Sequence, residues 1–300
     1  MPESTQPHPN APYTLAAPRR VPAESDVKLT GERPLQGVTP DSLLALHDAG
    51  YREVVTRLGA GIVLDVGCGV GHQTTRLRAP DRFVVGLDYH PATAALASHE
   101  FATSGACAFA AADGARLAIG AASVDAVCSS HIIEHFTDPE RHVAELARVL
   151  RDDGIAFVIT PNAPADFENP FHVYLFEAPH LQSLLLLFFD EVTVLGLEGS
   201  VELRADFATR RASGERILRL DPFALRHRIP RRWYVWAYER VLPLVYRLLG
   251  RTSGVGSGLD ESHLSITDTI TPTTPVLFAI VRRPRAPVDR ANRAGTGAAR

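Results

Sequence analysis

The chain of 300 residues has little lysine, methionine or tryptophan, and it lacks any long apolar run. Lys28 is the only lysine among 31 basic residues, so its positive charge is almost wholly arginine. With 34 acidic residues the formal net charge is -3, which gives no positive field for binding nucleic-acid phosphates. A membrane span needs about 20 consecutive apolar residues. We therefore expect neither a general nucleic-acid binder nor an integral membrane protein.

Cysteine is also scarce. The three residues Cys68, Cys107 and Cys128 form no C-x-x-C pair and lie within apolar runs. This pattern predicts buried reduced thiols in a cytoplasmic protein and excludes a thiolate metal cluster. The first 25 residues contain no apolar segment of the kind that a signal peptide requires. We expect no bound metal.

Hydrophobic residues make up 45% of the chain, enough for a full core. The composition along the chain predicts five parts. Residues 1–37 are expected to be a disordered proline-rich tail, and 38–203 the folded core. Residues 204–270 are expected to form a helical insertion, 271–284 the final strand of the core, and 285–300 a second disordered tail.

Short β-branched runs alternate with helical patterns from Gly61 onward, after one amphipathic helix for which Asp41 is a candidate N-cap. Strands that are apolar on both faces and separated by helices indicate a parallel sheet covered on both sides. The predicted fold is a doubly wound, Rossmann-like α/β sheet of seven strands, with the helical insertion before the last strand. The expected strands are 61–68, 82–89, 107–113, 124–130, 154–160, 191–199 and 275–283.

The stretch VLDVGCGVGHQT, residues 63–74, contains the motif that carries most chemical information. A strand ends at Asp65, and Gly67, Gly69 and Gly71 lead into an expected helix start. Glycines let the backbone turn sharply and approach a ligand closely, and a helix N-terminus offers unpaired N–H groups. A nucleotide-like cofactor is implied. His72 stands where a dinucleotide fingerprint needs a small residue, which disfavours NAD or FAD.

Two further acids follow the next two strands. Asp88 ends VVGLDYH, 23 residues after Asp65, and its carboxylate can accept both hydroxyls of a ribose. Asp113 follows the third strand and can accept from an adenine amine, with Tyr89 as a stacking neighbour. Strand ends of this kind meet at one edge of the sheet. Three alternatives stay open. Asp65 can simply cap the glycine turn, Asp88 can be an ordinary carboxylate at a strand end, and Asp113 can belong to an ordinary Asp-Gly turn.

These residues resemble the class I S-adenosylmethionine-dependent methyltransferases, over about residues 61–200 and the final strand. The resemblance implies S-adenosylmethionine as cofactor. It also implies that the methionine side is bound by Asp65, Gly67, Gly69, Gly71 and Ser130, the ribose by Asp88, and the adenine by Tyr89, Asp113 and Gly114.

The segment CSSHIIEHFTDPERH is similar to the family's stretch after the fourth strand, and it would place His131, Glu134 and His135 near the reacting methyl group. The same letters match H-x-x-E-H, a zinc-peptidase pattern carried on a helix. We expect that match to be accidental, because a strand runs directly into it and Pro139 restarts a helix just after it.

Downstream, PNAPADFENPFHVYLFEAPHLQSLL resembles methyltransferases of bacterial envelope-glycan genes, through Asn169, His172, Tyr174 and Phe176. The resemblance implies an O-methyltransferase that acts on a saccharide or a glycan-bearing small molecule. A sugar hydroxyl must lose its proton as the new bond forms, so a histidine is the expected base.

The candidate catalytic residues are His131, His172 and His135. His172 can equally be a structural histidine that holds the loop. If the acceptor is an amine or a carbon acid, no strong base is needed and these histidines would serve binding.

The insertion holds an aromatic and arginine-rich segment, residues 231–251, with both tryptophans, Trp233 and Trp236. It can be a lid over the acceptor, an anchor onto the core, or a helix at a membrane surface. The last possibility belongs to a second candidate activity, methylation of an isoprenoid quinone or another lipid. A third candidate is a non-catalytic scaffold that binds the cofactor. The oligomeric state stays open.

Overall fold

The computed structural model describes residues 39–102, 105–166, 169, 171–218 and 256–285. The predicted N-terminal tail, the aromatic segment 231–251 and nearly all of the predicted C-terminal tail lie outside these ranges. Within the described part, no helix is both long enough and apolar enough to cross a bilayer.

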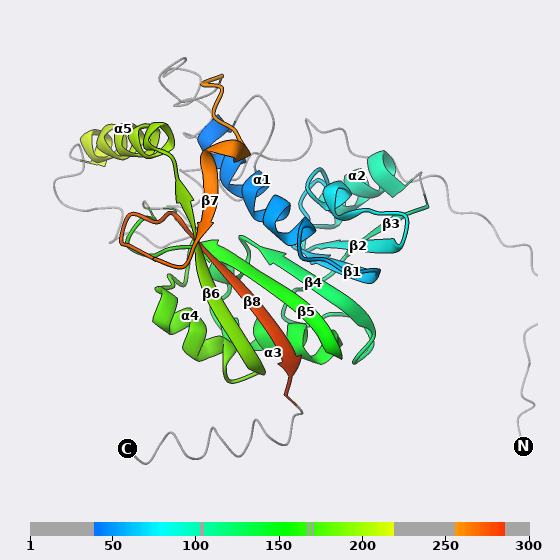
Figure 1. Ribbon diagram of the computed structural model, residues 1–300. Coiled ribbons are helices and arrows are strands. Elements are labelled where there is room, and N and C mark those ends of the chain that lie inside the picture. The colour runs from blue at the N-terminus through cyan, green and yellow to red at the C-terminus, as the bar shows by residue number, and fades with distance from the viewer. Residues whose placement is uncertain (1–38, 103–104, 167–168, 170, 219–255, 286–300) are drawn as a thin grey trace, which may run out of the picture.

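One sheet of eight strands forms the centre of the molecule, in the order β3-β2-β1-β4-β5-β8-β6-β7 (Figure 1). The first five strands in this order are parallel, and β8, β6 and β7 pair antiparallel. This topology confirms the predicted Rossmann-like α/β class. The strands are β1 Gly61–Val66, β2 Arg82–Asp88, β3 Cys107–Ala111, β4 Val124–Ser130, β5 Leu150–Pro161, β6 Phe189–Gly199, β7 Leu264–Thr267 and β8 Val276–Pro284.

The predicted count of seven strands is too low by one. The additional strand, β7, has the sequence LSIT and extends the edge of the sheet by pairing with β6. It lies inside the range expected to be a helical insertion. Four residues are too few for a clear alternating pattern, so the strand depends on its partner rather than on its own sequence.

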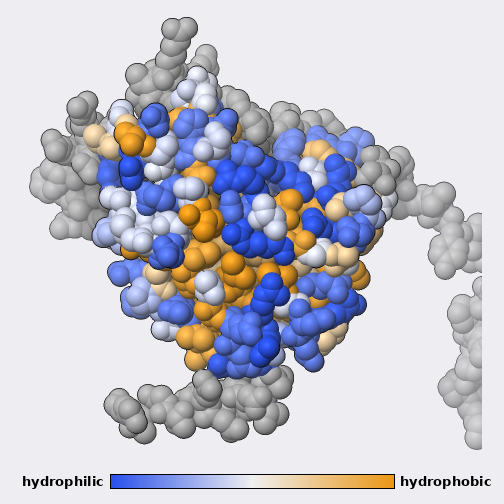
Figure 2. Space-filling model, viewed as in Figure 1, coloured by the Kyte–Doolittle hydropathy of each residue, from blue (hydrophilic) through white to orange (hydrophobic). Residues whose placement is uncertain are grey.

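Helices cover both faces of the sheet (Figure 1). Apolar side chains of α1 and α5 pack with the sheet in one buried cluster, and those of α3 and α4 pack in another. Figure 2 shows further hydrophobic residues gathered over the central part of the face in view. The helices are α1 Asp41–Val55, α2 Pro91–Phe101, α3 Pro139–Val149, α4 Ala178–Leu185 and α5 Val201–Leu218.

Two local expectations are wrong. The glycine loop leads into a short 3-10 turn, η2 Thr74–Leu77, instead of an α-helix. Two β-branched threonines begin this segment and Pro80 follows closely, so a long helix is disfavoured. Asp41 is the first residue of α1 and does not cap it. Its carboxylate instead accepts hydrogen bonds from the amides of Gly256 and Gly258.

Candidate functional site

The candidate site lies at the carboxyl edge of the parallel strands. Asp65 pairs with Gly86 in the ladder between β1 and β2, and Ser130, the last residue of β4, pairs with Ile159 of β5. Open α/β sheets bind ligands at this edge, so the residues that follow β1, β2, β3, β4 and β5 share one region.

Three glycines after β1 have positive φ angles, 83° at Gly67, 54° at Gly69 and 90° at Gly71. A Cβ at Gly67 would lie 2.8 Å from Ile132, and one at Gly71 would lie 3.0 Å from Phe101. A Cβ at Gly69 would meet no atom within 4 Å. The first and third glycines therefore allow close packing, whereas the backbone of Gly69 faces open space.

Asp65 is fully buried and holds neighbouring elements together. Its Oδ1 accepts from the Tyr51 hydroxyl of α1 at 2.8 Å, and its Oδ2 accepts from the Thr74 hydroxyl at 2.6 Å. Burial raises the pKa of Asp65 to about 6, against the opposing effect of these two hydrogen bonds. This geometry fits the alternative in which Asp65 fixes the glycine turn and makes no ligand contact.

Asp88 ends β2 beside the glycine loop and is nearly buried. Its Oδ2 accepts from the amide of Gly69 at 3.2 Å, and its Oδ1 accepts from the amide of His90 at 2.8 Å. Each carboxylate oxygen carries two lone pairs, and an acceptor of this kind suits the two hydroxyls of a diol. Tyr89 next to it is 76% exposed, which leaves its ring available for stacking.

Asp113 is exposed, and its Oδ1 accepts from the amide of Ala115, as in an ordinary Asp-Gly turn. The buried residue Gly114 is fixed by a histidine that the sequence did not single out. His142 of α3 donates from Nδ1 to the Gly114 carbonyl at 2.9 Å, and its Nε2 accepts from the Ser129 hydroxyl at 2.8 Å. This network holds the loop after β3 against β4.

The end of β4 gathers polar atoms that lack partners. In the described part of the chain four buried side-chain polar atoms make no hydrogen bond, and three of them belong to Ser130, His131 and Glu134. His131 adopts φ 53°, a strained value for a residue with a Cβ. Its ring lies 4.2 Å from that of His47 on α1, measured between centroids. Such a cluster is expected where a ligand completes the hydrogen bonding.

His135 and His172, with ring centroids 5.3 Å apart, form the other side of this cluster. His135 Nδ1 donates to the carbonyl of Phe171 at 3.0 Å. His172 Nδ1 donates to the carboxylate of Asp166 at 2.6 Å, and its Nε2 accepts from the Asn169 amide at 2.9 Å. Both rings are thus held in fixed orientations by the loop after β5.

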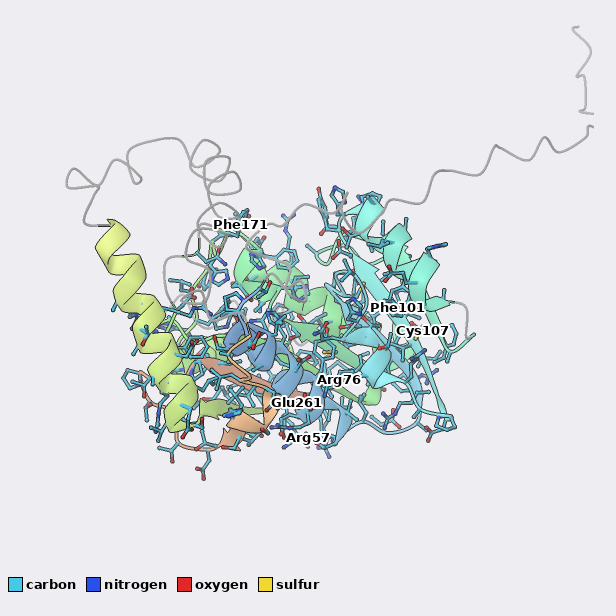
Figure 3. All side chains as sticks on the ribbon, turned by 90° about the horizontal axis from the view of Figure 1, so that it is seen from above. Arg57, Arg76, Phe101, Cys107, Phe171 and Glu261 are labelled. Carbon is cyan, nitrogen blue, oxygen red and sulfur yellow. The ribbon has the colours of Figure 1, made fainter. Side chains whose placement is uncertain are left out.

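The helix α5 supports that loop. Its Arg211 donates from Nη2 to the carbonyl of Asp166 at 3.0 Å, and its Arg210 donates from Nη1 to the Ser42 hydroxyl of α1 at 2.9 Å. In Figure 3, Phe171 marks the loop on the side of α5, and Phe101 marks the opposite side, near α2.

Sequence reasoning missed several residues that shape this site. Asp166 stands six residues before His172, and its presence in a short polar loop was a usable signal. Nothing in the sequence marked the others, because their partners are distant along the chain. These residues are His47, Tyr51, Thr74, Ser129 and His142.

Comparisons with known proteins agree with this geometry. A family described as a methyltransferase domain matches residues 64–158. A probable S-adenosylmethionine-dependent methyltransferase of Mycolicibacterium smegmatis is 34% identical over 168 residues, which cover 54% of this chain and 64% of that protein. A probable S-adenosylmethionine-dependent methyltransferase of Mycobacterium tuberculosis is 34% identical over 184 residues, which cover 59% of this chain and 66% of that protein. The match therefore spans just under two thirds of each relative's length.

Two solved structures share the fold. The [4+2]-cyclase SpnF has a TM-score of 0.51 and 19% identity, and the match covers 80% of this chain and 82% of that one. A phosphoethanolamine N-methyltransferase of Haemonchus contortus, in complex with phosphomonomethylethanolamine and S-adenosylhomocysteine, has a TM-score of 0.50 and 14% identity. That match covers 79% of this chain and 52% of the other.

The methyltransferase domain and the two relatives support the predicted class I S-adenosylmethionine-dependent methyltransferase. S-adenosylmethionine is the cofactor of this family, as the sequence predicted.

Proposed function

We propose that this protein transfers a methyl group from S-adenosylmethionine to a hydroxyl of a saccharide or of a glycan-bearing small molecule in the cytoplasm. The proposal rests on two features that lie at the same edge of the sheet. One is the open glycine loop beside Asp88, and the other is the group of buried polar atoms without hydrogen-bond partners at the end of β4. The three cysteines are buried free thiols, which suits a reducing compartment.

In this proposal the cofactor lies along the carboxyl edge of the sheet. Its methionine part lies against Gly69 and Ser130, and its ribose donates to Asp88. Its adenine lies by Tyr89 and the Asp113-Gly114 turn. Methyl transfer is a displacement at a carbon activated by the sulfonium, so the protein mainly has to hold acceptor and methyl in line.

His131 is the preferred general base among the three candidate histidines. Its Nε2 is buried without a hydrogen-bond partner, whereas Nε2 of His172 already accepts from Asn169. Nδ1 of His131 lies 3.7 Å from the Glu134 carboxylate, which stabilises the imidazolium formed when Nε2 takes the acceptor's proton.

A second candidate acceptor is a lipid such as an isoprenoid quinone. The loop that carries His172 continues into Val173, Tyr174 and Leu175, all of which are exposed. This apolar rim suits an acceptor with an apolar part. The SpnF likeness shows that the fold alone does not define the reaction, so a scaffold that only binds the cofactor is a third outcome of the test.

The test is incubation of the purified protein with radiolabelled S-adenosylmethionine and a cell extract, followed by separation into saccharide, lipid and protein fractions. Label in the saccharide fraction supports the proposal. Label in the lipid fraction favours the second candidate, and liposome co-sedimentation then tests surface binding. Cofactor binding without any label transfer would contradict an enzymatic role.

Two variants test the assigned residues in the same assay. Asp88→Ala removes the acceptor of the ribose hydroxyls and should weaken cofactor binding about tenfold or more in calorimetry, because each unsatisfied polar group costs about 1–3 kcal/mol. Asp88→Asn is the shape-matched companion. Cofactor affinity equal to that of the parent in Asp88→Ala would refute the ribose assignment.

His131→Ala should keep cofactor affinity and lose about 10²–10⁴-fold in turnover. Turnover equal to that of the parent would refute the assignment of His131 as the base.

A further inference from the structure

The methyl-transfer proposal uses Glu134 beside His131, but it does not use the approach of Glu134 to His135 and His172. Each of them offers one ligand atom, and the three atoms all lie within 4.8 Å of one another. They belong to two segments, the short 3-10 turn η4 Ile133–His135 and the loop after β5. The Glu134 carbonyl accepts from the amides of Val173 and Tyr174, at 2.8 and 3.0 Å. The backbone therefore fixes the distance between the two segments.

The imidazoles are oriented as metal ligands usually are. Both use Nδ1–H as a donor, His135 to the Phe171 carbonyl and His172 to the Asp166 carboxylate. In the neutral rings the lone pair is then on Nε2. Metal-binding histidines characteristically donate their other N–H to a carboxylate or a backbone carbonyl. The Asn169 amide, which now donates to Nε2 of His172, would be displaced by an ion.

Glu134 supplies the negative charge. It is 1% exposed, its Oε2 accepts from the Thr160 hydroxyl at 3.0 Å, and its Oε1 makes no hydrogen bond. Glu134 is thus a buried carboxyl group with one oxygen that makes no hydrogen bond in the described part of the chain, which is costly unless a cation lies against it.

We propose that Glu134, His135 and His172 bind one divalent first-row transition-metal ion on the acceptor side of the site. Two imidazoles and one carboxylate favour an ion such as Zn²⁺ or Fe²⁺ over Mg²⁺, and three protein ligands leave positions for water or for an acceptor oxygen. Only this last role rests on the proposed function. The donor set differs from the H-x-x-E-H peptidase pattern, because His131 is replaced by a histidine from a different loop.

The direct test uses the tag-free full-length chain, stripped with a chelator and titrated with Co²⁺ and, separately, with Zn²⁺. We expect one equivalent of Co²⁺ with visible absorption bands of nitrogen and oxygen coordination, and one equivalent of Zn²⁺ by calorimetry. Glu134→Gln, His135→Ala and His172→Ala should each lower the affinity at least 100-fold. Asp166→Asn should lower it about 10–100-fold, because it orients a ligand.

His180→Ala is the matched control, since His180 is an exposed histidine on α4 and should leave the titration unchanged. Circular dichroism and S-adenosylmethionine binding establish that each variant is folded. Glu134→Gln is the decisive variant because it keeps the shape of the side chain. The metal site is overturned if the parent takes up no more Co²⁺ or Zn²⁺ than folded Glu134→Gln does. It is also overturned if His180→Ala loses this uptake.

The two proposals fail separately. If Co²⁺ binding depends on the three residues but no label is transferred to any acceptor, the metal site is upheld and the proposed function is contradicted. If label transfer persists after chelation and the parent takes up no Co²⁺, the metal site alone is contradicted.

Discussion

Single residues at the sheet edge divide into those that shape the protein and those that face a ligand. Gly69 and Gly71 both have positive φ, yet a Cβ meets nothing at the first and three side chains at the second, among them Phe101 and Phe109 at 3.0 Å. Asp65 and Asp88 divide in the same way. Both carboxylate oxygens of Asp65 accept from Tyr51 and Thr74, whereas the carboxylate of Asp88 lies beside Gly69, whose backbone faces open space.

The glycine pair gives the first prediction at this scale. Gly69→Ala should lower S-adenosylmethionine affinity at least tenfold, because its methyl group enters ligand space, and should cost only about 1–2 kcal/mol of stability from its backbone strain. Gly71→Ala should add about 1–3 kcal/mol of overpacking to the same strain. Calorimetry and chemical denaturation measure the two effects. Equal loss of stability in both variants would contradict the assignment.

His142 gives a prediction for the effect of pH. Burial lowers its pKa to about 4, against the opposing effect of the Gly114 carbonyl and of the charges of Glu134, Asp113 and Glu145. The folded state thus favours the neutral ring, and the unfolded state takes up a proton near pH 6.5. Stability from this group is fully present above pH 6.5 and is lost as the pH falls toward 4.

Between pH 7.5 and pH 5 the parent should lose about 2 kcal/mol more of unfolding free energy than His142→Gln, which keeps an amide for Ser129 and Gly114 but does not titrate. Urea denaturation at both pH values measures the difference. Parallel pH profiles for parent and variant would show that the ring is not held neutral.

At the scale of elements, α5 supports the loop that carries Asp166. Arg211→Ala removes three hydrogen bonds to the carbonyls of residues 164–166. The amides of Ala165 and Asp166, which donate to the Asn162 carbonyl, should then exchange with solvent about tenfold faster. Arg204→Ala, which changes the same helix but breaks only an exposed contact to Glu198 of β6, is the control. Unchanged exchange in Arg211→Ala would mean that α5 does not support the loop.

The elements also show what the sequence could and could not predict. The strands from β1 to β6 and the final strand were predictable because each contains a short apolar run between turn residues. The edge strand β7 was not, because its four residues form a strand only against β6. The glycine loop was readable as a local pattern. The Ser129–His142–Gly114 network and the approach of His172 to Glu134 were not, since they join residues far apart along the chain.

For the whole molecule, β8 is the element on which the sheet depends. It pairs with β5 on one side and with β6 on the other, and residues Val276 to Ala279 are fully buried. Without it, β6 and β7 have no ladder to the parallel strands. A chain that ends at Thr273 should therefore lose cooperative unfolding and bind a hydrophobic dye. A chain that ends at Arg285 keeps every strand and is the matched control.

Circular dichroism during thermal melting and dye fluorescence compare the two truncated chains. A sharp, parent-like melting transition in the chain that ends at Thr273 would show that the parallel strands form an independent unit and that β8 is dispensable for it.

The position of β8 also sets the order of events on the ribosome. β5 and β6 leave the exit tunnel first, and the strand that must lie between them is made on the order of ten seconds later at usual rates of translation. During that interval the nascent chain exposes two unpaired apolar edges. The period of greatest aggregation risk for this protein is thus its own synthesis, and slow translation of the segment between β6 and β8 lengthens it.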